Sequence, residues 1–276
     1  MSSGTLYVVA TPIGNLSDAS PRAMETLTTC DLIACEDTRV ARTLLARHGI
    51  GTRLVALHEH NERAASVKLI EAIVAGSNVA LVSDAGTPGI SDPGAWLVSE
   101  AHRVGIRVSP VPGPSAGAAA YSAAGFGSPQ FFFAGFLPAS GAARREALEA
   151  LRMPYPVILY EAPHRILKTV NDLAERFGAD REVAIGRELT KKFEEFARLP
   201  LGQAKAWIEA NPHRQQGEFV LVLAAGEART APAMDEDRVL DVLLDSLSPS
   251  DAARLAARIT GLPRKALYQK ALARAK

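Results

Sequence analysis

The sequence predicts an α/β protein built from two domains, and three observations support this. Short apolar runs rich in β-branched residues alternate with longer helical patterns along most of the chain. Continuous apolar strands separated by helices are typical of sheets that are covered on both faces. The composition, 47% hydrophobic and 22% charged, is that of an ordinary globular protein. The 276 residues give room for two domains of roughly 100–200 residues, with a small appendage.

The apolar runs predict strands in a first domain, 1–112, and in a second domain, 113–226. The expected strands are 6–10, 32–35, 54–57, 79–82 and 108–111 in the first domain, and 131–134, 157–160, 183–185 and 219–223 in the second. Helical patterns such as 63–75 and 166–177 lie between them and are closed by glycine. The aromatic run 131–133 is expected in the strand core, because it carries no interleaved charge for stacking RNA bases. The stretch after Glu195 has a looser pattern, and we assign it no role.

A further segment, 234–276, carries no strand pattern and is expected to be wholly helical. It follows a polar, proline-containing linker, 227–233. Ser248 is expected to cap a helix that runs through Ile259, and Pro263 begins another, so the segment resembles a helix-turn-helix. The apolar residues expected to form its small core are Leu255, Ile259, Leu262, Leu267 and Leu272.

Charge in this segment is unevenly distributed. From Ser250 onward every charged residue except Asp251 is basic, whereas the stretch before it is acidic. The basic residues are Arg254, Arg258, Arg264, Lys265, Lys270, Arg274 and Lys276. In a chain whose net charge is only +1, such segregation predicts an appendage that contacts RNA, with a merely solvated basic helix as the alternative.

Other features narrow the class of protein. No apolar run approaches the roughly 20 residues that span a bilayer, and the first residues lack a signal-peptide pattern. Cys30 and Cys35 are expected to be buried thiols of a reducing compartment, not a disulfide or a metal pair. We therefore expect a soluble, cytoplasmic protein with no membrane partner.

Unusual polar clusters follow the predicted strands at their carboxyl ends, where open α/β sheets bind their ligands. One such loop is ordinary turn chemistry, since glycine, proline, aspartate and serine dominate turns. Here the clusters all lie in strand-to-helix loops, while the helix-to-strand connections are short and plain. The loops are 11–18, 36–39, 58–63, 83–94, 112–116 and 161–165. Their shared position predicts an active site.

The loop 83–94 is the most informative of these. Its glycines and prolines favour an irregular backbone that approaches a ligand closely and exposes N–H donors. It holds no lysine or arginine, it is not a P-loop, and no G-x-G-x-x-G follows the first strand. Such a loop suits a zwitterionic or cationic cofactor better than a polyphosphate, and Gly86 is expected to keep a bare Cα against that cofactor.

Eight motifs in these loops and in the second domain carry a family resemblance. They are TPIGNLSD (11–18), EDTR (36–39), HEHNE (58–62), SDAGTPGISDPG (83–94), PGPSA (112–116), GFLP (135–138), YEAPHR (160–165) and RELTKKFEE (187–195). In this order they resemble the tetrapyrrole-methylase-like (class III) S-adenosylmethionine-dependent methyltransferases. The resemblance is closest to the ribosomal RNA small subunit methyltransferase I branch. It covers about residues 5–226 and extends into the helical tail.

The resemblance implies a homodimer that binds S-adenosylmethionine between its two α/β domains. It also implies a product, a 2′-O-methylated cytidine in the decoding region of the 16S ribosomal RNA. The positions implied to bind the cofactor are Pro12, Gly14, Asp84, Ala85, Gly86, Thr87, Pro88, Ile90, Ser115, Ala116, Tyr160, Glu161, Glu218 and Phe219.

Methyl transfer to a ribose hydroxyl needs positioning and a group that favours the alkoxide, but no metal. The candidate catalytic residues are Glu36, Asp37, Arg39, His60, Glu62 and Lys191. The pair Glu36 and Asp37 has a structural alternative, since carboxylates also cap helices. His60 and its neighbour His58 lack a third ligand at metal-binding spacing, so no metal site is expected.

Three other functions remain open at this point. The substrate of the same fold could be a tetrapyrrole or another small molecule, although the basic tail argues against this. The chain could be a metal-dependent phosphohydrolase that uses Asp84 and Asp92, although Pro93 and Gly94 beside Asp92 favour a turn. It could also bind RNA without catalysis, which would leave the polar loops without a role.

Overall fold

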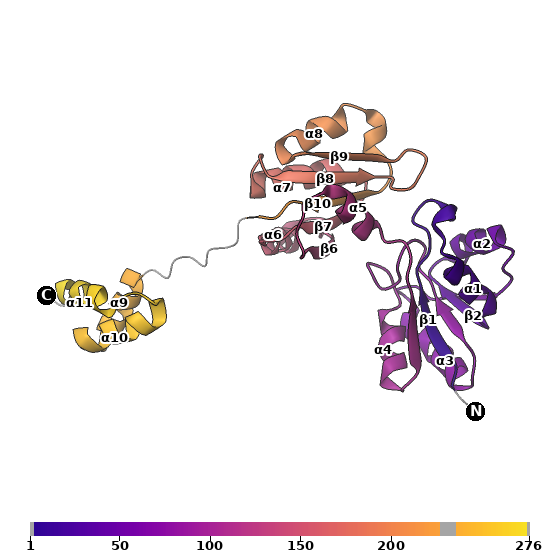
Figure 1. Ribbon diagram of the computed structural model, residues 1–276, viewed down its shortest axis with the longest axis horizontal. Helices are drawn as coiled ribbons and strands as arrows, with labels where there is room; N and C mark the ends of the chain where they lie inside the picture. The colour runs from indigo at the N-terminus through magenta and orange to yellow at the C-terminus, as the bar shows by residue number, and fades with distance from the viewer. Residues whose placement is uncertain (1–2, 227–235, 275–276) are drawn as a thin grey trace. The chain divides into compact units, whose positions relative to one another are not determined.

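The structure, a computed structural model, describes residues 3–226 and 236–274. The chain divides into two compact units, 1–226 and 227–276, and each is described by itself (Figure 1). The predicted linker, 227–233, and Lys276 lie outside the described residues.

The first sheet of the larger unit consists of five parallel strands in the order β3-β2-β4-β1-β5. The strands are β1 (Thr5–Val9), β2 (Leu32–Cys35), β3 (Arg53–Ala56), β4 (Val79–Leu81) and β5 (Arg107–Val111). Each matches a predicted strand to within one residue at either end. Because all five are parallel, their carboxyl ends and the loops that follow them meet at one edge.

Helices cover both faces of this sheet, as its continuous apolar strands predict. On one face α1 (Pro21–Thr29) and α2 (Thr38–Arg47) pack against Val9, Ile33 and Val82, and on the other α3 (Glu62–Val74) and α4 (Ala95–Arg103) pack against Leu6, Ala34 and Leu81 (Figure 1). Neighbouring strand residues thus belong to opposite cores, because strand side chains alternate between faces. A short 3₁₀ helix, η1 (Leu16–Asp18), follows β1.

The second sheet is mixed and has the order β6-β7-β10-β8-β9. Its strands are β6 (Phe132–Phe136), β7 (Val157–Glu161), β8 (Glu182–Arg187), β9 (Glu195–Pro200) and β10 (Phe219–Leu223). The helices are α5 (Ala116–Ala124), which covers one face, and α6 (Gly141–Ala150), α7 (Ile166–Phe177) and α8 (Leu201–Glu209), which cover the other; η2 (Pro212–Gln215) precedes β10.

Strand β9 was not predicted. Among the described strands it is an edge strand that pairs with β8, so it is half exposed, and the charged residues Glu195 and Arg198 interrupt its apolar residues. A continuous apolar run marks a strand buried on both faces, and β9 has no such run.

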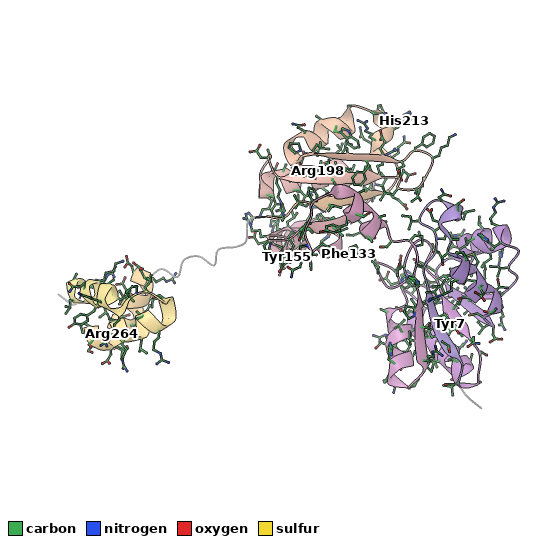
Figure 2. The ribbon with its side chains drawn as sticks, in the orientation of Figure 1. Tyr7, Phe133, Tyr155, Arg198, His213 and Arg264 are labelled. Carbon is green, nitrogen blue, oxygen red and sulfur yellow. The ribbon has the colours of Figure 1, made fainter. Side chains whose placement is uncertain are left out.

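The expectation that the aromatic run 131–133 lies in the core is wrong for two of its residues. Phe131 is 49% exposed and Phe132 is 38% exposed, because β6 is the other edge strand of the sheet. Only Phe133, labelled in Figure 2, packs inward, with its ring 5.1 Å from that of Tyr160.

The smaller unit consists of α9 (Glu236–Leu244), α10 (Pro249–Thr260) and α11 (Arg264–Arg274). Ser248 caps α10 as predicted, since its hydroxyl accepts a hydrogen bond from the backbone N–H of Asp251 at 3.3 Å. The predicted core is mostly wrong. Leu267 is buried, but Ile259, Leu262 and Leu272 are exposed and Leu255 is half-buried. The core is instead formed by Leu240, Ala253, Ala256, Leu267 and Ala271, because small alanines let the helices approach closely.

The charges of the smaller unit are less segregated in space than in sequence. Lys270 pairs with Glu236 and with Asp237, the latter at 3.0 Å, and Arg274 pairs with Asp237 and Asp241 at 3.0 and 3.2 Å. The acidic helix α9 therefore neutralises part of the basic helix α11. Across the described parts of the chain, no helix is long and apolar enough to span a membrane.

Candidate active site

The larger unit contains a cavity of about 410 Å³, here called the central cavity, whose walls come from both sheets. The loops after β1, β4, β5 and β7 line it, together with the start of β10. Its volume is in the range that holds a cofactor or another small ligand. The predicted cofactor positions that line it are Ala85, Gly86, Thr87, Ile90, Ser115, Ala116, Tyr160, Glu161, Glu218 and Phe219.

The remaining predicted positions lie outside the central cavity. Pro12 and Asp84 line a neighbouring cavity of about 240 Å³ between the β1 and β4 loops and α2. Gly14 and Pro88 line two further cavities, and Gly14 shares its cavity with Lys191.

The mixed order of the second sheet explains why the start of β10 belongs to the site. Strand β10 runs antiparallel to β7 and to β8, so Phe219 pairs with Glu161 on one side and Arg187 on the other. Both of those residues end their strands. The amino end of β10 therefore lies at the same edge as the carboxyl ends of its neighbours, which places Glu218 there.

Backbone hydrogen bonds hold the loop 83–94 in place. Thr11 and Gly86 exchange two of them, from the N–H of Thr11 at 2.8 Å and from the N–H of Gly86 at 3.1 Å. The Thr11 hydroxyl also donates to the carbonyl of Ser83 at 3.2 Å, and the Thr87 hydroxyl donates to the carbonyl of Pro114 at 3.1 Å. These bonds join the loops after β1, β4 and β5 into one rigid wall of the cavity.

The backbone conformation at position 86 requires a glycine. Its φ of +84° is in the region that side chains rarely adopt. A Cβ there would meet Ile13 Cγ2 at 3.4 Å and the Pro114 carbonyl at 3.7 Å, which are ordinary contacts. The expected need for a bare Cα thus has a reason that is independent of any cofactor.

Asp92 is a lining residue of the central cavity that sequence reasoning weighed only as a metal ligand or a turn residue. Burial, followed by the negative charges of Glu36 and Asp84, raises the pKa of its carboxyl to about 6, although a hydrogen bond from Ser83 acts in the opposite direction. The SDPG tetrapeptide shows only a turn, whereas the burial comes from the fold and the acidic neighbours are Glu36 after β2 and Asp84 at the start of the same loop.

The motif EDTR forms a helix cap. At the start of α2, Asp37 accepts a hydrogen bond from the backbone N–H of Arg39 at 2.8 Å and three from its guanidinium at 2.6, 3.0 and 3.1 Å. These bonds lower the pKa of Asp37 to about 2. Burial and Asp84 raise the pKa of Glu36. Neither carboxylate nor Arg39 lines the central cavity, so the capping alternative describes Asp37 well.

The loop after β3 holds the other two candidate bases. His60 is exposed on a turn, with its ring 6.0 Å from that of His58. Glu62 accepts hydrogen bonds from the backbone N–H groups of Gly94 at 2.8 Å and Trp96 at 3.1 Å, and so caps α4. Glu62 thereby anchors the end of the loop 83–94.

Lys191 lies between two carboxylates. Its ammonium donates to Glu188 at 2.8 Å and to Glu218 at 3.0 Å. Burial alone would lower the pKa of Lys191, but these two bonds outweigh it and raise the pKa. Lys191 is therefore a cation at neutral pH and no proton acceptor.

The Glu161 carboxylate is fully buried, and its negative charge is compensated by neighbouring groups. Arg165 lies 2.8 Å from it, and the Thr169 hydroxyl donates to it at 2.6 Å. Thr169 accepts a hydrogen bond in turn from buried Arg144 at 2.8 Å, and Arg144 also pairs with Asp172 at 2.6 Å. This chain of bonds fixes the position of Glu161 in the cavity wall.

The chain is similar to known proteins along nearly its whole length. The tetrapyrrole (corrin/porphyrin) methylase model matches residues 5–205, and a model named RsmI C-terminal HTH domain matches residues 230–275. The ribosomal RNA small subunit methyltransferase I of Pseudomonas aeruginosa is 49% identical over 99% of both chains. The protein of the same name from Escherichia coli O157:H7 is 46% identical over 98% of this chain and 96% of its own.

The chain belongs to this family. It is a methyltransferase, as the motifs predict. The prediction of an S-adenosylmethionine-dependent enzyme is likewise confirmed at the level of the family.

Solved structures confirm the predicted fold. A Thermus thermophilus uroporphyrin-III C-methyltransferase complexed with S-adenosyl homocysteine has a TM-score of 0.55 at 16% identity, over 81% of this chain and 98% of its own. A diphthine synthase has a TM-score of 0.62 at 17% identity, over 80% and 90%. At these identities the likeness shows the fold alone.

Proposed function

We propose that this methyltransferase transfers a methyl group from S-adenosylmethionine to the ribose 2′-hydroxyl of a cytidine in small-subunit ribosomal RNA, in the decoding region. The observation that carries the proposal is the central cavity itself. One wall is the rigid loop 83–94, which holds no lysine or arginine, so the cavity suits a sulfonium better than a polyphosphate. The match to relatives that are named for small-subunit ribosomal RNA covers 98–99% of this chain, which supports RNA as the substrate.

Bound S-adenosylmethionine would supply a methyl group on a sulfonium, which is a good leaving group. Ala85, Gly86 and Thr87 would hold it through a backbone that hydrogen bonds already fix. The Tyr160 hydroxyl accepts a hydrogen bond from the N–H of Gly117 at 3.1 Å and so fixes the start of α5 beside the cavity. Such a preformed wall lowers the entropic cost of alignment.

The proton acceptor we propose is Asp92. The carboxylates and the phenol that line the cavity belong to Asp92, Tyr160, Glu161 and Glu218. Burial raises the pKa of Tyr160, so it stays protonated at neutral pH. Glu161 and Glu218 are held by cations. Asp92 has a pKa near the operating pH, which favours general base catalysis.

Calorimetry tests the first part of this proposal. We expect the purified protein to bind S-adenosylmethionine in EDTA, and an absolute magnesium requirement would favour the phosphohydrolase that uses Asp84 and Asp92. Incubation with labelled cofactor and small-subunit ribosomal RNA should then place label on one ribose. Label on a base, or on an added tetrapyrrole instead of RNA, would contradict the proposal.

Three features of the enzyme are part of the same proposal. We propose that it acts in the cytoplasm as a homodimer, and light scattering would test the dimer. We also propose that the chain forms three domains, 1–112, 113–226 and 234–276, and that the last of these binds RNA. The cations of that unit best suited to RNA are Arg258, Arg264 and Lys265, since Arg254 pairs with Asp251 and Lys270 and Arg274 bind the acids of α9. Arg264, labelled in Figure 2, is exposed.

A further inference from the structure

We infer that a second cavity binds the backbone phosphates of the RNA strand beside the target ribose. This basic cavity is defined by Arg47 and His48 at the end of α2, Lys191 and Lys192 after β8, and the loop 14–17 after β1. Its volume is about 780 Å³, and no carboxylate lines it. The inference rests on the proposed function, because it takes RNA to be the substrate.

Two cations and one histidine of this cavity are free to meet a ligand. Within 3–226 and 236–274, Arg47, His48 and Lys192 form no ion pair, and all three are exposed. Arg47 and His48 also suit the negative end of the α2 dipole, which offers a purely structural reason for them. That reason does not extend to Lys192, which comes from a loop of the other sheet and faces the same cavity.

One residue in the wall of the same cavity has a buried hydroxyl that finds no hydrogen-bond partner among the described residues. Thr190 lines it, and the structure gives its buried Oγ1 no hydrogen-bond partner. The backbone holds Thr190 at a φ of +67° and Glu188 at +50°, in the left-handed region that such residues rarely adopt. Residues in this region cluster at ligand-binding sites. A phosphate oxygen would accept the hydrogen bond that Thr190 lacks.

The basic cavity adjoins the central cavity, because each of two loops gives one residue to one cavity and the next residue to the other. Ile13 lines the central cavity and Gly14 the basic one, and Leu189 and Thr190 divide in the same way. A Cβ on Gly14 would lie 2.4 Å from Lys191 Cγ, so only glycine fits where the two loops meet. A ribose in the central cavity would therefore place a neighbouring phosphodiester at the basic one.

The chemistry of the basic cavity favours an RNA strand over a free anion. Arginine and lysine bind phosphate oxygens through charge-assisted hydrogen bonds. Phe193 is 65% exposed beside this cavity, and the ammonium of Lys192 lies 5.4 Å from its ring centre. Cations interleaved with an exposed aromatic ring are typical of surfaces that bind single strands, where the ring stacks on a base.

The test compares two variants that each remove two exposed arginine or lysine charges. Arg47→Ala/Lys192→Ala removes charges of the basic cavity. Arg53→Ala/Arg107→Ala is the matched control, because these arginines start β3 and β5 at the opposite edge of the first sheet and are also exposed. RNA affinity is measured by filter binding across a salt series with saturating S-adenosylmethionine. Steady-state methylation and cofactor calorimetry follow.

Two lost phosphate contacts should lower the slope of log affinity against log salt by about 1.4–1.8. The KM for RNA should rise at unchanged kcat, with cofactor affinity as in the wild type. The control variant should match the wild type, and Arg47→Lys/Lys192→Arg should retain the slope.

Several results would overturn the inference. These are a wild-type slope and KM in Arg47→Ala/Lys192→Ala, an equal effect of the control variant, or a loss of cofactor affinity, which would mean that the loops only brace the central cavity. Inorganic phosphate that binds the cavity without competing with RNA would also overturn it. A wild-type enzyme that methylates no small-subunit RNA would contradict the proposed function instead, and the salt slopes with that RNA would still decide the basic cavity.

Discussion

The loops of the two sheets of the larger unit carry acidic residues in or near the central cavity, but in opposite electrostatic states. On the first sheet, Glu36 and Asp92 have raised pKa values, because burial and neighbouring acids disfavour their ionised forms. On the second sheet, Glu161 and Glu218 are each held by a cation, Arg165 or Lys191.

This difference suggests that the carboxylates of the two sheets have different roles, one in proton transfer and the other in holding the cavity wall in place. An acid crowded by other acids gains from taking up a proton, whereas an acid paired with a cation resists protonation and stays where it is. The first sheet therefore offers the reactive carboxylate, and the second sheet offers fixed walls. The predictions below test that division.

The largest effect on activity is expected from substituting one carboxylate of each sheet, Asp92 and Glu161. Asp92→Asn should lower the single-turnover rate by roughly 10²–10⁴-fold, because the ribose hydroxyl loses its proton acceptor. Its affinity for S-adenosylmethionine should change little. Glu161→Gln should show the reverse pattern, with a weakened affinity for the cofactor.

Rapid-quench methylation and calorimetry on both variants would measure this contrast. If Asp92→Asn kept a near-normal rate, the search for the base would return to Glu36, His60 and Glu62. An equal loss of rate and affinity in both variants would remove the division between the sheets.

A large effect on stability is expected from the bonds behind Glu161. Arg144 is 3% exposed and joins Asp172 to Thr169, which in turn holds Glu161. Arg144→Met breaks this buried pair and should lower the free energy of unfolding by about 3–5 kcal/mol. Chemical denaturation would measure it. The control is Arg145→Met, at the exposed neighbouring residue, which should have the stability of the wild type. Equal stability of the two variants would show that this chain of hydrogen bonds does not contribute to the free energy of unfolding.

A smaller effect is expected from two glycines of the loop 83–94. Gly86 and Gly89 have φ values of +84° and +78°, so valine at either should cost about 1–3 kcal/mol of stability. Only Gly86 lines the central cavity. Gly86→Val should therefore also weaken cofactor binding, and Gly89→Val should not. Thermal melts with calorimetry would separate the two effects, and equal cofactor affinities would move the cofactor away from Gly86.

Sequence reasoning worked best where local pattern decides the structure. The strands of the first sheet are short apolar runs buried on both faces, and the cap at Ser248 depends on four consecutive residues. It failed for β9, where the exposed edge tolerates the charged residues Glu195 and Arg198 within the strand, and for the helical core, where Ala253 and Ala256 replace the expected Ile259.

In the candidate site, too, some features are visible in local sequence motifs and others depend on the fold. The loop 83–94 is visible as a motif, and most of its predicted cofactor positions line the cavity. The raised pKa of Asp92 comes first from its burial, then from Glu36, which follows β2, and from Asp84 in the same loop. The burial and the nearness of Glu36 depend on the fold and are not visible in a local pattern. The place of Glu218 depends on the direction of β10, which a strand pattern alone does not give.

The pH dependence gives a finer test of the first sheet. The acceptor must be ionised, so the methylation rate should rise about tenfold per pH unit below pH 6 and level off above it, given the Asp92 pKa of about 6. Glu36→Gln should move this inflection to lower pH, because the negative charge of Glu36 raises the pKa of Asp92. A profile that keeps its inflection in Asp92→Asn would assign the ionisation to another group.

The smallest effect, on RNA affinity, is expected from two cations of the helical unit. One of them is paired with acids and the other is exposed, so the comparison between paired and unpaired charges extends to this unit. Lys270 is paired with Glu236 and Asp237, as Glu161 is paired with Arg165, whereas Arg258 is exposed. Arg258→Ala should lower the slope of log RNA affinity against log salt by about 0.7–0.9 and leave the melting temperature unchanged. Lys270→Ala should keep the slope and lower the melting temperature slightly, since it releases two acids of α9. Equal slopes for both variants and the wild type would mean that these helices do not hold RNA.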